Sequence, residues 1–314
     1  MSAVRTSAVT PRTPEKPGPG PLPGAILRAL RPAVRRRIEG LTTGEHASVL
    51  LGEGTELAQI RPYGPGDDVR RIDWNATART GEPHVRKLVA ERAFTAWVAL
   101  DRSPSMAFGT ADRRKADVAE GVVAVLAHLT TGGGGRVGLL AFGGSRPLTI
   151  PPRAGRAGAI GIVEAARRDP EAAEVGRTPV GDALAGLDRL ARRRGLVAVV
   201  SDFMGPRDWQ RPLARLATRH EVLAVEVRDP REDELPDVGE LVLEDPETGR
   251  QLRADTGSRR LRERFASEAA AERREVAGGI SRSGATHVVL STRGDWLKGL
   301  ALHLRGRTLQ GGRR

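Results

Sequence analysis

The sequence contains no cysteine, and this absence excludes several kinds of chemistry. A chain without thiols forms no disulfides, holds no zinc through thiolates and has no cysteine nucleophile. It also lacks an apolar run of the roughly 20 residues that a transmembrane helix requires, because candidates such as residues 121–129 are far shorter. We therefore expect a cytoplasmic protein with no transmembrane segment and no secretory signal.

Aromatic residues are scarce, at 3% of the chain, whereas basic residues are in excess. Lysine and arginine number 51 against 39 aspartates and glutamates, which gives a formal charge of +12 and an isoelectric point of about 11.2. This charge favours polyanionic partners, so a basic nucleic-acid-associated protein is one alternative. The arginines are scattered through expected helices, and few aromatic rings are present to stack on bases. We therefore expect no specific nucleic-acid partner.

Signatures of catalysis are also missing from the sequence. It has no His-Glu-x-x-His helix and no nucleophile elbow, and its six histidines are dispersed. The glycine run 132–135 lacks the Lys-Ser/Thr pair of a phosphate-binding loop. We expect no enzymatic activity and keep a metal-dependent hydrolase as the less favoured alternative.

Composition divides the chain into four parts. Residues 1–24 are rich in Pro, Gly, Ser and Thr and predict a disordered tail, while residues 306–314 predict a flexible basic tail. Residues 25–92 predict an N-terminal extension, in which a helix over 25–41 precedes a small β-rich part. Residues 93–305 predict the main domain.

The extension carries a dense motif, Tyr63-Gly64-Pro65-Gly66-Asp67-Asp68-Val69-Arg70-Arg71-Ile72-Asp73-Trp74. Its glycines and prolines indicate a defined turn. In one interpretation, its aspartates pair with Arg70, Arg71 and Arg79 and hold an irregular module together. In the other, the motif is a partner-binding surface. The candidate partner-binding residues are Asp67, Asp68, Arg70, Asp73 and Trp74.

From residue 94 onward, short apolar runs alternate with helical patterns. The expected strands of the sheet are 95–100, 136–142, 147–150, 196–200, 221–227 and 287–290, with a hairpin at 240–255. The expected helices are 113–131, 155–168, 178–194, 208–219, 259–276 and 296–304. This alternation predicts an α/β fold with a doubly wound, mostly parallel sheet.

Oxygen-bearing side chains follow two of the expected strands. Asp101, Ser103 and Ser105 come directly after strand 95–100, and Asp202 follows strand 196–200. Thr178 is expected to cap a central helix, with Pro179 as its first residue. If the two strands are neighbours where the strand order reverses, these loops meet in one crevice. Two carboxylates and three hydroxyls suit Mg²⁺, although each piece separately is also compatible with a turn or a helix cap.

The residues quoted above resemble the von Willebrand factor A domain with its metal-ion-dependent adhesion site. More narrowly, the Tyr63–Trp74 motif, residues 101–106, Ser201-Asp202-Phe203 and residues 220–230 resemble the bacterial family of unknown function numbered fifty-eight. The likeness covers roughly residues 40 to 305, and its Gly-Asp-Asp-x-Arg-x-Ile-Asp-Trp run makes it specific.

The resemblance implies a metal-dependent protein-interaction adaptor that acts with a MoxR-type AAA+ ATPase. It implies that Ser103, Ser105 and Thr178 contact Mg²⁺ or Mn²⁺, while Asp101 and Asp202 hold the ion largely through water. The open coordination position would take an acidic side chain from a client protein, since two carboxylates only neutralise the ion.

Overall fold

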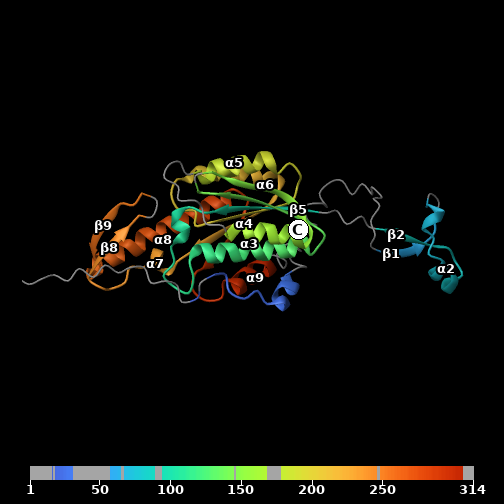
Figure 1. Ribbon diagram of the computed structural model, residues 1–314, viewed down its shortest axis with the longest axis horizontal. Helices are drawn as coiled ribbons and strands as arrows, with labels where there is room; N and C mark the ends of the chain where they lie inside the picture. Colours follow the sequence, from blue (N-terminus) through green and yellow to red (C-terminus); the bar gives the residue numbers. More distant parts are fainter. Residues whose placement is uncertain are drawn as a thin grey trace, which may run out of the picture. The chain divides into compact units, whose positions relative to one another are not determined.

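The computed structural model describes residues 16, 18–30, 57–64, 67–88, 94–144, 146–167, 178–245 and 248–306. The chain divides into two compact units (Figure 1). The larger unit comprises Met1–Leu41 and Phe94–Arg314, and the smaller unit comprises Thr42–Ala93.

The larger unit is built on a six-stranded sheet with the order β10-β7-β6-β3-β4-β5. The strands are β3 (Thr95–Asp101), β4 (Arg136–Phe142), β5 (Leu148–Ala154), β6 (Leu196–Ser201), β7 (Glu221–Arg228) and β10 (Thr286–Ser291). All neighbours are parallel except β5, which pairs antiparallel with β4. The strand order reverses at β3, which lies between β4 and β6. The predicted doubly wound, mostly parallel sheet is confirmed.

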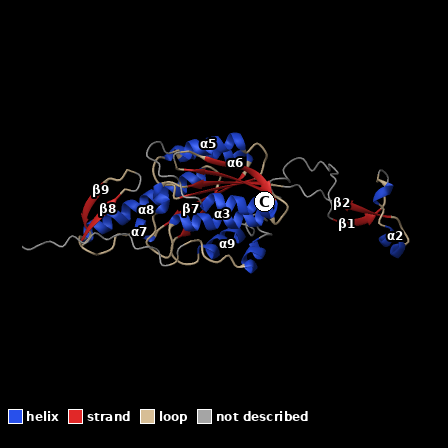
Figure 2. Cartoon of the chain, in the orientation of Figure 1, coloured by secondary structure: helices blue, strands red, loops and turns tan. Residues whose placement is uncertain are grey.

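Helices cover both faces of this sheet (Figure 2). One face carries α3 (Lys115–Thr131), α4 (Gly155–Arg167) and α9 (Trp296–Gly306), and the other carries α5 (Val180–Leu190), α6 (Gln210–Arg219) and α8 (Arg259–Arg282). Successive residues of β3 alternate between the two apolar clusters beneath these helices, because a strand points its side chains to opposite faces. Val98 and Leu100 pack in one cluster, and Trp97 and Ala99 in the other. Of the helices in the described ranges, none has the length and apolar character to cross a bilayer.

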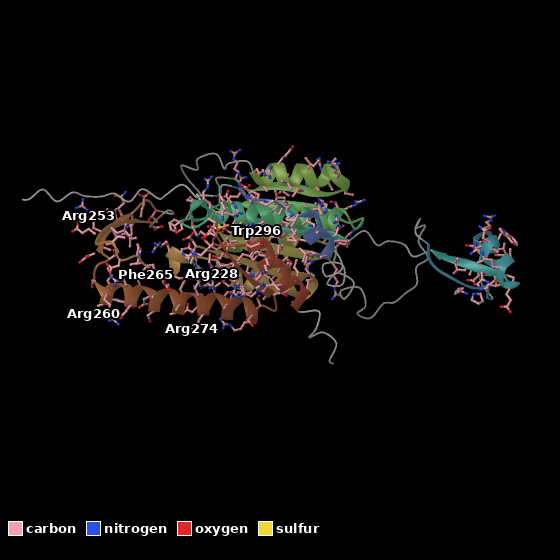
Figure 3. All side chains as sticks on the ribbon, turned by 90° about the horizontal axis from the view of Figure 1, so that it is seen from below. Arg228, Arg253, Arg260, Phe265, Arg274 and Trp296 are labelled. Carbon is pink, nitrogen blue, oxygen red and sulfur yellow. The ribbon has the colours of Figure 1, made fainter. Side chains whose placement is uncertain are left out.

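After β7, a short helix α7 (Pro230–Asp233) leads to an antiparallel hairpin of β8 (Glu240–Glu244) and β9 (Gln251–Asp255). Figure 3 shows Arg253 on this hairpin, with Arg260 and Arg274 at different points along α8. The exposed basic residues of α8 are interleaved with exposed acidic ones: Arg259, Arg260, Glu263, Arg264, Glu268, Arg274, Glu275 and Arg282. The surface of the helix therefore carries mixed charge, whereas a nucleic-acid backbone attracts a uniformly positive surface.

The segment 18–30 lies against the larger unit. Residues 24–30 are helical, and Leu27 and Leu30 are buried in the apolar cluster that contains α3. Trp296 Nε1 donates a hydrogen bond to the carbonyl of Pro19 at 2.9 Å, and Arg113 donates to the carbonyl of Gly18 at 3.1 Å. Residues 18–24 therefore correct our expectation of a disordered tail over 1–24, because distant side chains supply the contacts that the segment's composition lacks. Residues 1–15, 17 and 307–314 lie outside the described residues.

The smaller unit contains two antiparallel strands, β1 (Leu57–Pro62) and β2 (His84–Leu88). A 3-10 helix, Val69–Arg71, and the helix α2 (Trp74–Thr80) lie between them in the chain. The expected extension over 25–92 is therefore divided: its first helix, as far as residues 24–30 show, packs with the larger unit. The β-rich remainder forms a unit of its own.

Gly121→Ala is expected to disrupt the packing of segment 18–30. The added Cβ would lie 2.3 Å from Cζ2 of Trp296 and 3.0 Å from Cβ of Pro19. We expect the free energy of unfolding, measured by urea denaturation, to fall by about 1–3 kcal/mol. Gly161→Ala on α4 is the control, since nothing lies within 4 Å of its added Cβ. The control should gain up to about 1 kcal/mol, and equal stability of the two variants would contradict this packing.

Candidate functional site

Asp101 ends β3 at the reversal of strand order and is 4% exposed. Its Oδ1 accepts a hydrogen bond from the backbone N–H of Ser103 at 2.9 Å, and its Oδ2 accepts one from the hydroxyl of Ser201 at 2.6 Å. A 3-10 helix, Pro104–Ala107, begins at once, and Pro104 suits its first position because proline has no N–H to satisfy there. This turn brings the hydroxyl oxygens of Ser103 and Ser105 to 3.1 Å from each other.

Asp202 directly follows β6 and is 2% exposed. Its Oδ1 accepts a hydrogen bond from the backbone N–H of Met204 at 3.0 Å, and the side chain of Ser105 also hydrogen-bonds to its carboxylate. Its Oδ2 accepts a hydrogen bond from Nζ of Lys115 at 2.7 Å. The structure thus links Asp101, Ser103, Ser105 and Asp202 into one continuous hydrogen-bonded group, as their places in the sequence indicated.

Thr178 lies two residues before α5. The N-cap of α5 is Pro179, whose extended backbone (ψ 153°) keeps it outside the helix while its carbonyl accepts a bond from the N–H of Ala183. The prediction that Thr178 caps this helix is therefore wrong by one residue. The start of α5 is held instead by Asp208, which accepts a hydrogen bond from the N–H of Gly181 at 3.1 Å.

The two buried carboxylates differ in charge. Burial, together with the negative charge of Asp202, raises the pKa of Asp101 to about 6. Burial also disfavours the charged form of Asp202, but the ammonium of Lys115 outweighs it and holds the pKa of Asp202 below its usual value. The group therefore carries one firmly ionised carboxylate and a second one that is short of a positive partner.

Lys115 is the residue of this site that our sequence analysis did not identify. It is the first residue of α3 and only 1% exposed, and its ammonium contacts both Asp202 and Glu232. A signal was present in the sequence, because a cation at a helix N-terminus is unfavourable beside the helix dipole. A lysine in that position, on the helix that follows the Asp101 loop, indicates a nearby negative charge.

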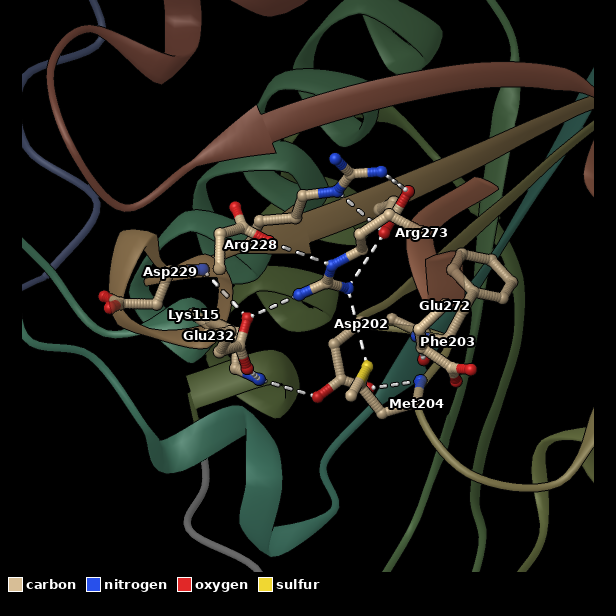
Figure 4. Close-up of polar contacts among 12 residues, drawn as sticks. Lys115, Asp202, Phe203, Met204, Arg228, Asp229, Glu232, Glu272 and Arg273 are labelled. Carbon is tan, nitrogen blue, oxygen red and sulfur yellow. Dashed lines mark hydrogen bonds and ion pairs between the residues drawn. The ribbon is translucent and has the colours of Figure 1, made fainter. Parts of the chain in front are cut away.

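The ion pairs continue away from Lys115 along the edge of the sheet (Figure 4). Glu232 of α7 accepts a hydrogen bond from Arg273 of α8 at 2.9 Å, and Arg273 also donates to Glu226 of β7 at 3.0 Å. Glu226 has no exposed surface and accepts further bonds from Arg228 and His287. Burial opposes its charge, but these bonds and the nearby cations lower the pKa of Glu226 to about 2. Alternating charges thus connect α3, α7, α8 and β7.

Phe203 holds the turn after Asp202 in an unusual conformation. Its φ is +54°, in the left-handed region that costs a residue with a side chain about 1–2 kcal/mol. The turn is fixed because Phe203 N–H donates to the hydroxyl of Ser201 at 3.0 Å, and the ring is buried edge-on against Trp209 with centroids 5.2 Å apart. Burial of the ring offsets the backbone strain and holds the direction of Asp202.

In the smaller unit, the predicted aspartates make local bonds. Asp67 pairs with Arg61 at 2.6 Å and accepts the N–H of Gly64, which corrects our expectation of a pair with Arg70, Arg71 or Arg79. Asp68 accepts the N–H of Arg70 at 2.9 Å. Asp73 caps α2 by accepting the N–H groups of Asn75 and Ala76. These contacts support the structural interpretation of the motif's carboxylates.

Trp74 has a different place in the same motif. It is 71% exposed, and Val69, five residues earlier in the motif, is 61% exposed. Large apolar side chains in such positions are available for contact with another molecule. The motif therefore combines carboxylates that fix its shape with an indole ring that remains accessible.

The mostly parallel sheet, with Asp-x-Ser-x-Ser starting at the last residue of β3 and an aspartate directly after β6, defines a von Willebrand factor A-like fold. The family described as "Protein of unknown function DUF58" matches residues 59–275, and the chain belongs to this family. The family assignment made from the sequence is thereby confirmed.

The chain is 43% identical over 275 residues to uncharacterized protein Rv1480 of Mycobacterium tuberculosis (strain ATCC 25618 / H37Rv). The matched region covers 87% of this chain and 86% of that protein. Among solved structures, it is similar to conserved hypothetical protein BatB from Bacteroides thetaiotaomicron, with 17% identity and a TM-score of 0.45 over 69% of this chain and 99% of that chain. It is also similar to a von Willebrand factor type A protein from Catenulispora acidiphila, with 19% identity and a TM-score of 0.33 over 56% of this chain and 42% of that chain.

Glu226→Gln is expected to lower the free energy of unfolding by about 2–4 kcal/mol at pH 7, because it leaves the buried charge of Arg273 short of a partner. The pKa of Glu226 is about 2 in the folded chain, against 4.5 for a free glutamate. Its stabilising contribution is therefore complete above pH 4.5 and is lost as the pH falls toward 2. Urea denaturation between pH 7 and 3 should show the difference between wild type and variant shrinking below pH 4.5.

The exposed Glu240→Gln on β8 is the control for this series and should follow the wild type at every pH. A deficit of Glu226→Gln that stays constant from pH 7 to pH 3 would contradict the assignment of a low pKa to Glu226.

Proposed function

We propose that this protein is a noncatalytic adaptor that binds another protein at the carboxyl edge of its sheet. The observation that carries the proposal is the hydrogen-bonded group of Asp101, Ser103, Ser105 and Asp202. It lies where the strand order reverses, which is the position at which open α/β sheets bind their ligands. The turn at Phe203 is strained, as is common where a fold holds a functional loop in place.

A divalent cation fits the chemistry of this group. The donors are all oxygens, the two serine hydroxyls are 3.1 Å apart, and Asp101 and Asp202 add two buried carboxylates. In the part of the chain that the structure describes, no group of three or more His, Asp or Glu side chains is placed to hold a metal ion. Hydroxyl groups would therefore complete the set of metal ligands. Ser103, Ser105 and Thr178, with Asp101 and Asp202, would hold Mg²⁺ or Mn²⁺. The ion would supply the positive charge that attracts an acidic side chain of a client protein.

The hydrogen bonds of the two carboxylates support an adaptor rather than a metal-dependent hydrolase. Both oxygens of Asp101 accept bonds, from Ser103 and Ser201, and both oxygens of Asp202 accept bonds, from Met204 and Lys115. A general base must reach the proton it removes, and Asp101 and Asp202 are only 4% and 2% exposed. The arrangement suits the holding of loops in a fixed shape for binding.

We propose a MoxR-type AAA+ ATPase as the partner, as the resemblance noted in the sequence implies. With a partner that consumes ATP, we propose that both proteins act in the cytoplasm. The ATPase would act on the adaptor or on its bound client, in the assembly or activation of a protein complex. The exposed Trp74 of the smaller unit would provide a second contact, independent of the cation.

Asp101→Ala is expected to lower capture of a MoxR-type ATPase, in a pull-down with Mg²⁺, by at least about tenfold. The variant loses a carboxylate of the site, and EDTA should reduce capture by the wild type to a similar extent. Asp188→Ala is the control: it also removes a buried carboxylate, but one that pairs with Arg215 and Arg219. Capture that is indifferent to both EDTA and Asp101→Ala would refute the proposed binding site.

Trp74 offers an optical test of the second contact. It is 71% exposed, whereas Trp97, Trp209 and Trp296 are 6%, 0% and 4% exposed, so acrylamide quenching of the folded chain reports mainly on Trp74. Addition of the ATPase should protect this fluorescence, since binding would cover the ring. Trp74→Phe should remove the protected signal and weaken capture. Undiminished quenching in the presence of bound ATPase would show that the ring is not part of the interface.

A further inference from the structure

Lys115 places a positive charge in the candidate metal site. Its Nζ is 2.7 Å from Oδ2 of Asp202, and it also contacts Oε1 of Glu232. The side chain is 1% exposed and passes beside the ring of Phe108, whose centroid lies 5.9 Å from Nζ. The ammonium therefore serves as a cation for one of the two carboxylates that a metal ion would need.

A metal ion and this ammonium cannot both remain in place at low energy. Like charges repel strongly where solvent is excluded, and Asp202 is 2% exposed. A divalent cation bound near Asp202 would have to displace Lys115 from Oδ2 or accept a position farther away. The contact between Lys115 and Asp202 thus opposes metal binding.

We propose that Lys115 is a tethered counter-ion that competes with the divalent cation for Asp202. Without metal, the ammonium neutralises Asp202 and holds the end of β6 against the start of α3. When a cation binds, Lys115 gives up Asp202 and keeps Glu232 as its partner. The inference deepens the metal site proposed above, but it concerns metal binding itself and does not depend on which protein is the partner.

Glu232 is suited to retain Lys115 because two other groups hold it in place. Its Oε2 accepts a hydrogen bond from Arg273 at 2.9 Å and one from the N–H of Asp229 at 3.0 Å. Asp229 is itself fixed by the hydroxyls of Thr110 and Thr292, both at 2.6 Å. A carboxylate anchored in this way stays beside Lys115 after Asp202 is released, so the ammonium is never buried without a negative partner.

The type of residue also suits this exchange. Of the 51 basic residues only four are lysines: Lys16, Lys87, Lys115 and Lys298. An ammonium is a compact point charge with three donors, whereas the planar guanidinium prefers fixed, paired contacts. A lysine can therefore bridge two carboxylates in one state and keep one of them in the other.

The test is the affinity of the full chain for Mn²⁺, measured by electron paramagnetic resonance of the free ion. Lys115→Met removes the charge and keeps an unbranched side chain, and we expect it to bind Mn²⁺ at least about tenfold more tightly than the wild type. Lys298→Met, an exposed lysine on α9, is the matched control and should bind as the wild type does. Adding Asp202→Asn to Lys115→Met should abolish the gain.

A second measurement uses the unaltered protein and so does not depend on the folding of a variant. With ¹⁵N at lysine Nζ, the buried ammonium of Lys115 is distinguished from exposed ones by its slow proton exchange. Saturating Mg²⁺ should shift its resonance and leave that of Lys298 unchanged. An unmoved Lys115 resonance under saturation overturns the inference. So does an Mn²⁺ affinity of Lys115→Met that is no tighter than that of the wild type.

These outcomes are separate from those of the proposed function. Tight Mn²⁺ binding by Lys115→Met without capture of the ATPase would support the competition and refute the adaptor role. Capture that depends on Mg²⁺, together with equal Mn²⁺ affinity of Lys115→Met and wild type, would support the adaptor role and overturn the competition.

Discussion

The structure depends on keeping the carboxylate of Asp202 charged in a position from which water is excluded. An isolated buried charge is strongly unfavourable, so a cation must lie close to it. Lys115 fulfils this requirement at 2.7 Å, from the first residue of a helix on the neighbouring layer. The same need for compensation explains the ion pairs that follow. Glu232 pairs with Lys115, and Arg273 pairs with Glu232.

This chain of charges joins layers that the apolar core keeps apart. The sheet separates two hydrophobic clusters, one under α3, α4 and α9 and the other under α5, α6 and α8. Only beyond the ends of the strands can a residue of α3 and a residue of α8 approach a common partner, and they do so at Glu232. The edge that carries the candidate site is thus also the place where the two faces of the domain are coupled. A ligand bound there would act on both.

Much of the fold could be predicted from the sequence because its signals are local. Residues 196–200 are apolar throughout, as expected for a strand covered on both faces, and alternation with helical patterns predicted the parallel sheet. Asp101, Ser103, Ser105 and Asp202 were identified because the carboxyl ends of neighbouring parallel strands lie at one edge. The ordered conformation of segment 18–30 was harder to predict from the sequence. It depends on contacts with Trp296 and Arg113, which are far away in the chain.

The sequence by itself determined the family, the class of fold and four linked oxygen donors of the candidate site, since each follows from short motifs and periodicity. Only the tertiary structure decided how those donors are charged. Lys115 lies 87 residues from Asp202 and 117 from Glu232 along the chain, and no local pattern records which carboxylates will surround it. Thr178 shows another limit: it was expected to cap a helix whose N-cap is in fact Pro179. Electrostatic partners are set by distance and burial, and these exist only once the chain has folded.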